Sequence, residues 1–107
     1  MTMSEANTID IVAHNKETGK LLLVMTEHRT WDNVSKMHKQ LFRKANTYVQ
    51  FALSENFKEN FPGFSPADVV IKLDCACEPG KDTLIYFQQI QKGLQKYGMG
   101  FEFEVCS

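Results

Sequence analysis

The chain has 107 residues, a length that accommodates one domain of ordinary size and leaves no room for a second. Hydrophobic residues make up 43% and charged residues 23% of the sequence, which is typical of a globular domain and excludes a disordered chain. The net charge of −1 argues against binding to nucleic acid or to an anionic membrane through the overall field of the protein.

The start of the chain and its cysteines indicate the cellular compartment. Residues 1–7 are polar and lack the apolar run of a signal peptide, so we expect a disordered tail on a single domain that covers residues 1–107. The longest apolar run, Leu21–Met25, is far too short to cross a membrane. The cysteines are odd in number and indicate reduced thiols; they are Cys75, Cys77 and Cys106. The sequence therefore predicts a cytoplasmic protein that does not enter a membrane.

Two strands are predicted near the start, Thr8–His14 and Leu21–Glu27. Apolar residues alternate in the first, and the second begins with an uninterrupted apolar run. Gly19 suits the left-handed position of a three-residue hairpin loop with a bulge. This register pairs Ala13 with Leu23. It therefore places the odd-numbered residues of both strands on one face of the sheet.

A long helix is predicted to follow, beginning at Thr30 or Asp32, either of which could cap it. Its apolar stripe fades near Phe57 and ends before Pro62. Such a helix would be about 35–40 Å long, so we expect its last turns to break or overhang. The stripe consists of Val34, Met37, Leu41, Ala45, Tyr48, Val49, Ala52 and Leu53.

The second half alternates strands with a helix. We predict a strand at Asp68–Cys77, a helix at Asp82–Tyr97 that ends at Gly98, and a strand at Phe101–Val105. Gly93 inside the helix suggests close contact with the sheet. Only one face of the last strand is apolar, which favours both helices on one face. The sequence thus predicts an α+β fold: a two-layer sandwich in the order β-β-α-β-α-β, with a mixed four-stranded sheet, right-handed crossovers and two helices on one face.

The residues assigned to the uncovered face of this sheet have an apolar centre and a charged edge. The apolar members are Val12, Leu22, Val24 and Val70, and the charged members are Asp10, His14, Lys72, Asp74, Glu102 and Glu104. An apolar patch with a polar rim is typical of a protein interface, although β-branched residues also favour strands on solvated faces. We expect this face to bind a protein partner or a second copy of the chain.

Other chemistry is weakly indicated. Cys75 and Cys77 are separated by one residue and are both predicted to point into the core, so we expect buried thiols and no metal or cofactor. His14 beside acids could act as a general base, but the pattern places no nucleophile with it. A basic stripe on the first helix could meet phosphate, but without interleaved aromatic residues we read it as a solvated face and expect no nucleic acid. The stripe consists of Lys36, Lys39, Arg43 and Lys44.

Short segments spread over most of the chain resemble a family of short, uncharacterised bacterial proteins. They are Trp31-Asp32, Lys44-Ala45-Asn46-Thr47-Tyr48 with Phe51, Phe61-Pro62, Val69-Val70-Ile71-Lys72 and Gly100-Phe101-Glu102-Phe103-Glu104-Val105. The relatives tend to be acidic after the Trp-Asp pair, whereas this chain has Lys36 and Lys39. The resemblance implies a bacterial cytoplasmic origin and the same element order, and it transfers no activity or catalytic residues.

These observations lead to three hypotheses of function. The first is a non-catalytic protein-interaction domain, in its commonest form a homodimer, that uses the open sheet face. The second is a small enzyme or ligand-binding protein with a site near His14 and the neighbouring acids. The third, by analogy with small acidic α+β domains, is an inhibitor or immunity-type partner of a toxin.

Overall fold

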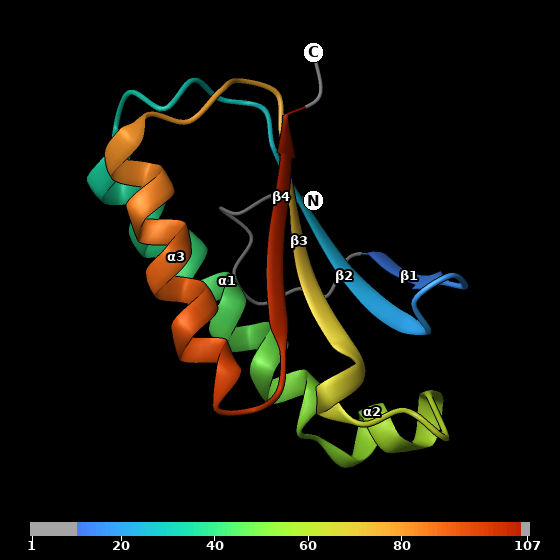
Figure 1. Ribbon diagram of the computed structural model, residues 1–107. Coiled ribbons are helices and arrows are strands. Elements are labelled where there is room, and N and C mark those ends of the chain that lie inside the picture. Colours follow the sequence, from blue (N-terminus) through green and yellow to red (C-terminus); the bar gives the residue numbers. More distant parts are fainter. Residues whose placement is uncertain (1–10, 106–107) are drawn as a thin grey trace.

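The computed structural model describes residues 11–105 and consists of a four-stranded sheet with two long helices on one face (Figure 1). The strands lie in the order β1-β2-β3-β4; β1 is antiparallel to β2, and β2, β3 and β4 are parallel. The elements are β1 (Ile11–Asn15), β2 (Lys20–Glu27), α1 (Val34–Ala52), α2 (Glu55–Asn60), a 3-10 turn (Pro66–Asp68), β3 (Val69–Cys75), α3 (Lys81–Gln95) and β4 (Gly100–Val105).

The α+β class, the mixed sheet and the two long helices on one face are therefore confirmed, with α2 and the 3-10 turn as additions. The predicted tail at residues 1–7, the predicted strand start at Thr8, and the positions of Asp10 and Cys106 lie outside the described residues. None of the helices within residues 11–105 has the length and hydropathy that a membrane-spanning helix needs.

The hairpin between β1 and β2 has a four-residue loop, residues 16–19, instead of the predicted three-residue loop. Asn15 pairs with Lys20, and its side-chain oxygen accepts a hydrogen bond from the N–H of Glu17 at 3.0 Å, which starts the loop one residue early. Gly19 has a φ of +73°, so its predicted left-handed conformation is confirmed. The predicted register was wrong by one residue, and every side chain of β1 consequently lies on the opposite face.

Alternate residues of β2 and β3 form the core beneath the helices, as predicted. The buried members are Leu21, Leu23 and Met25 of β2, and Val69, Ile71, Leu73 and Cys75 of β3. The helices contribute Met37, Leu41, Tyr48, Phe87, Ile90 and Leu94. The even-numbered neighbours on β2 and β3 are half-buried and face the other way. The predicted parity is thus right for these two central strands and wrong for β1.

The first helix breaks where the apolar stripe becomes irregular. α1 ends at Ala52, and Ser54 caps the short helix α2 by accepting a hydrogen bond from the N–H of Phe57 at 3.2 Å. Phe57 is fully buried, and its ring contacts Phe51 edge-on, with 5.6 Å between the centroids. The short helix α2 thus contributes Phe57 to the hydrophobic core.

The predicted caps of α1 were wrong. Its N-cap is Asn33, and the hydroxyl of Thr30 donates instead to the carboxylate of Asp32. After α3, the predicted glycine position is confirmed, because Gly98 has a left-handed backbone conformation with a φ of +77°. Gly93 does not mark close contact with the sheet, since no atom outside the local helix backbone lies within 4 Å of the position that its Cβ would occupy.

Candidate functional site

The uncovered face of the sheet carries a short apolar row across β2 and β3. Leu22 pairs with Val70, and Val24 lies at the next position along β2 on the same face. All three side chains are half-buried, and neither α1 nor α3 lies on this side of the sheet (Figure 1). Gly100 pairs with Val70 on its other side, and a Cβ there would lie 3.4 Å from a Val70 methyl group. The absence of that side chain leaves the Val70 methyl group uncovered on the β4 side.

A charged group continues this face toward β4. The register brings Lys72 beside Glu102, and Asp74 beside Glu104. The ammonium of Lys72 lies 3.0 Å from a Glu104 oxygen and 3.5 Å from Oδ1 of Asp74. The hydrogen bond to Glu104 and the charge of Asp74 together raise the pKa of Lys72 despite partial burial. Oδ1 of Asp74 is buried and has no hydrogen bond within the described part of the chain, so the nearby ammonium compensates its charge.

The structure does not bring the predicted β1 residues to this face. Val12 pairs with Leu23 and packs against the core, and His14 pairs with Leu21. The ring of His14 contacts Phe64 edge-on at a centroid distance of 5.3 Å. His14 therefore lies on the opposite side of the sheet from the Lys72 charge group, which removes the geometric basis for a histidine and carboxylate site. On β1, Ala13 occupies the open face instead, opposite Leu22.

The basic stripe of the first helix is also smaller than predicted. Lys36, Lys39 and Arg43 are exposed, whereas Lys44 is fully buried, with its ammonium 5.5 Å from the centroid of the Tyr48 ring. Lys44 lies on the inward stripe of α1, three residues after Leu41 and four before Tyr48. That spacing could have revealed its burial from the sequence.

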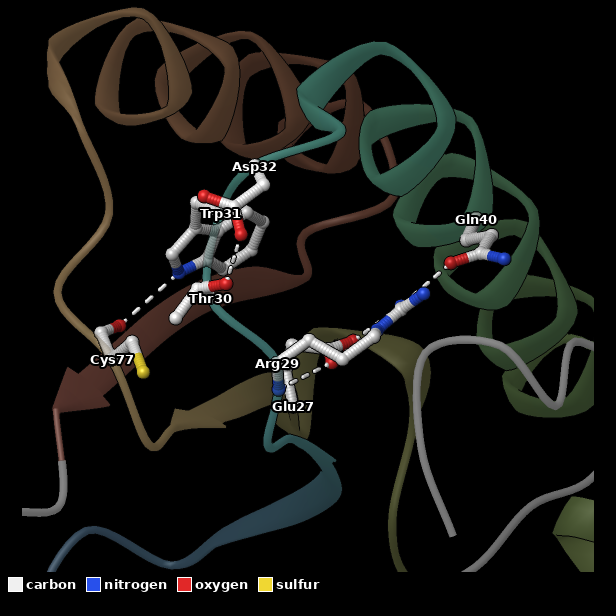
Figure 2. Close-up of polar contacts among 7 residues, drawn as sticks. All are labelled: Glu27, Arg29, Thr30, Trp31, Asp32, Gln40 and Cys77. Atoms are coloured by element: carbon white, nitrogen blue, oxygen red, sulfur yellow. Dashed lines mark hydrogen bonds and ion pairs between the residues drawn. The ribbon is translucent and has the colours of Figure 1, made fainter.

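A second polar cluster, which the sequence reasoning missed, lies at the carboxyl ends of β2 and β3 (Figure 2). Glu27 is the last residue of β2 and is 1% exposed. Its two carboxylate oxygens accept hydrogen bonds from Nε and Nη2 of Arg29 at 2.6 and 2.7 Å. Nη2 also donates to Gln40 on α1 at 2.7 Å. The signal in the sequence was an acid in phase with the buried residues of β2.

Burial alone would raise the pKa of Glu27, but the hydrogen bonds and charge of Arg29 outweigh it, and the pKa lies below the ordinary value of 4.5. The same contact raises the pKa of Arg29. Both carboxylate oxygens are already bound by the guanidinium, so Glu27 is not placed to take a proton from a substrate. We therefore assign this cluster the structural role of joining the end of β2 to α1.

Trp31 lies at the same end of the sheet and packs against the core. Its indole N–H donates to the carbonyl of Cys77 at 3.1 Å (Figure 2). Its ring contacts Phe87 edge-on, with 5.9 Å between the centroids. Cys75 is buried, as predicted, but Cys77 lies beyond the end of β3 and is half-buried. Within residues 11–105, no three His, Cys, Asp or Glu side chains are grouped closely enough to hold a metal ion.

A groove of about 320 Å³ lies between α1 and α3. Its walls include Phe42, which is 59% exposed, and Tyr86. Next to it, the ring of His38 stacks on Tyr86 with 4.2 Å between centroids, and Nε2 lies 2.9 Å from the hydroxyl of Thr83. Burial lowers the pKa of His38. The groove is mostly apolar, and the lining residues form no acid–base pair.

Comparison with known proteins identifies a family for this chain but assigns it no activity. No curated protein and no solved structure matches the chain significantly. A family model described as a family of unknown function, DUF6572, matches residues 1–107, the whole chain. The chain therefore belongs to the DUF6572 family of unknown function.

Proposed function

We propose that this protein is a non-catalytic interaction domain that forms a homodimer through the open face of its sheet. The observation that carries the proposal is the adjacent placement of Leu22, Val24 and Val70 on a face that neither long helix covers. Apolar side chains that share one face are stabilised when a second surface removes them from water. A two-fold pairing of identical faces is the commonest way to achieve this.

The charged residues around the apolar row favour a specific contact over non-specific association. The Lys72 ion pairs lie beside the row, which gives the apolar centre and polar rim of a typical interface. We place the protein in the cytoplasm, which is supported by the odd number of cysteines in the sequence.

The experiment is a measurement of solution mass by light scattering for the native protein and for Val24→Glu. The substitution places a carboxylate in the apolar row, opposite Lys72, so a cross-strand ion pair within the subunit helps the variant to fold. We expect a dimer for the native protein and a monomer for the variant. Val24→Thr, which keeps the shape and strand propensity, is expected to weaken the dimer without loss of the fold.

The matched control is Val34→Glu, because Val34 is 37% exposed at the start of α1, away from the open face. This control is expected to remain dimeric. A native protein that is monomeric at every accessible concentration would refute the homodimer, as would a Val24→Glu variant that is folded and still dimeric.

A further inference from the structure

β4 is an edge strand, and within residues 11–105 its strand partner is β3 alone. In an edge strand, every second residue directs its N–H and C=O away from the sheet. These groups can pair with an extended segment of another chain, which then becomes a further strand of the sheet. The six residues Gly100–Val105 are long enough for such pairing.

On the helix side of this edge, apolar side chains remain uncovered. Phe103 and Val105 are each 40% exposed, and Leu84 on α3 is 38% exposed. Leu84 and Phe103 line a groove of about 390 Å³ between α3 and β4, whose inner wall includes Phe87. An added strand would direct every second side chain toward this groove, where an apolar side chain is favoured.

On the open side of the same edge, the side chains are acidic. Glu102 and Glu104 are both exposed. Glu104 shares Lys72 with Asp74, whereas Glu102 has no ion pair within the described residues. The remaining side chains of an added strand would lie beside these two carboxylates, where a cation is favoured and an anion is disfavoured.

The same charges argue against a second copy of β4 as the added strand. An antiparallel pair centred on Phe103 would place Glu102 of each copy beside Glu104 of the other. Like charges at directly opposed positions destabilise a strand pair, and acids at an edge prevent self-pairing. The complementary strand carries lysine or arginine where β4 carries glutamate, and apolar residues at the alternate positions.

We propose that the free edge of β4 binds an extended segment of a partner protein in which basic and apolar residues alternate. This site is separate from the apolar row of the open face, and it does not depend on the homodimer. Backbone pairing supplies affinity, the groove between α3 and β4 selects the apolar side chains, and Glu102 and Glu104 select the basic ones.

The test is fluorescence anisotropy with a labelled peptide of alternating lysine and valine, and with a control peptide that has glutamate in place of lysine. We expect saturable binding of the first peptide only. Glu102→Lys should weaken binding about tenfold, because it converts an attractive cross-strand position into a repulsive one. Val105→Glu should also weaken peptide binding, because it removes an apolar contact for the valine side chains of the peptide. The matched control Glu55→Lys changes an exposed carboxylate on α2 and should bind normally.

Two N-methylated peptides separate strand addition from simple charge attraction. In a strand, the lysine amides point to one edge and the valine amides to the other, so methylation of one set blocks pairing with β4 and methylation of the other does not. We expect one methylated peptide to bind and the other to fail. Equal binding of both, or full binding to Glu102→Lys, would overturn the proposal. Normal peptide binding by Val24→Glu would show that this site stands whatever the outcome for the homodimer.

Discussion

Replacement of Arg29 by methionine tests the role assigned to the cluster at the carboxyl end of β2. Arg29 makes two short hydrogen bonds to a carboxylate that is 1% exposed. Removing one partner of a fully buried ion pair costs about 3–5 kcal/mol. The side chain of Arg29 is 42% exposed, so water can partly replace it, and we reduce the expected loss of unfolding free energy to about 2–3 kcal/mol. That loss corresponds to a fall in Tm of about 10 °C or more.

The stability difference between the native protein and Arg29→Met should depend on pH. The pKa of Glu27 is lowered in the native protein, so its stabilising contribution is present above the ordinary value of 4.5 and is lost as the pH falls below it. Without Arg29, burial raises the pKa of the Glu27 carboxyl group, and only the weaker influence of His28 opposes it. Arg29→Met therefore loses stability as the pH rises through that ordinary value. The stability difference between the two proteins should be small in acid and full at neutral pH.

The assay is urea unfolding followed by the fluorescence of Trp31, the single tryptophan, over a series of pH values. The double variant Glu27→Leu with Arg29→Met should recover most of the loss, because it leaves no buried charge. Gln40→Ala, which removes a single neutral partner, should cost about 1 kcal/mol. The reasoning is refuted if Arg29→Met unfolds at the native midpoint at neutral pH, or if its stability loss is independent of pH.

Two other predictions concern stability. Lys72→Met should lower the unfolding free energy by about 1–2 kcal/mol, because it leaves the buried Asp74 oxygen without a nearby cation. Its control, Lys58→Met, removes an exposed ion pair and should cost under about 0.5 kcal/mol. Equal losses in urea unfolding would contradict the role of Lys72. Gly98→Ala should destabilise by about 1–2 kcal/mol because φ is +77° and the new Cβ would lie 3.1 Å from that of Ala67. Gly93→Ala meets no atom and should stabilise α3 by up to about 1 kcal/mol, so thermal unfolding should move in opposite directions for the two glycines.

The prediction of the open face succeeded on the two central strands and failed on β1. In β3 the charged residues Lys72 and Asp74 alternate with apolar residues, so a shifted register would have buried them. β2 is apolar on both faces from Leu21 to Met25, and its pairing with β3 places its odd-numbered residues on the same face. The face of β1 depended on one additional residue in the hairpin loop, and that residue was decided by a side-chain hydrogen bond of Asn15. Val12 and His14 therefore lie on the helix side of the sheet, and Ala13 lies on the open face.

By itself, the sequence determined the order of the strands and the two long helices, the α+β class, the inward face of β3, and the glycine positions at the hairpin and after α3. These features depend on contacts between residues close in the chain, which apolar spacing and backbone sterics specify locally. Tertiary structure alone decided the strand order, the residue at which α1 breaks, the burial of Glu27 against Arg29 and the edge position of β4. Each of these depends on which distant elements lie side by side, and a one-dimensional pattern does not contain that information.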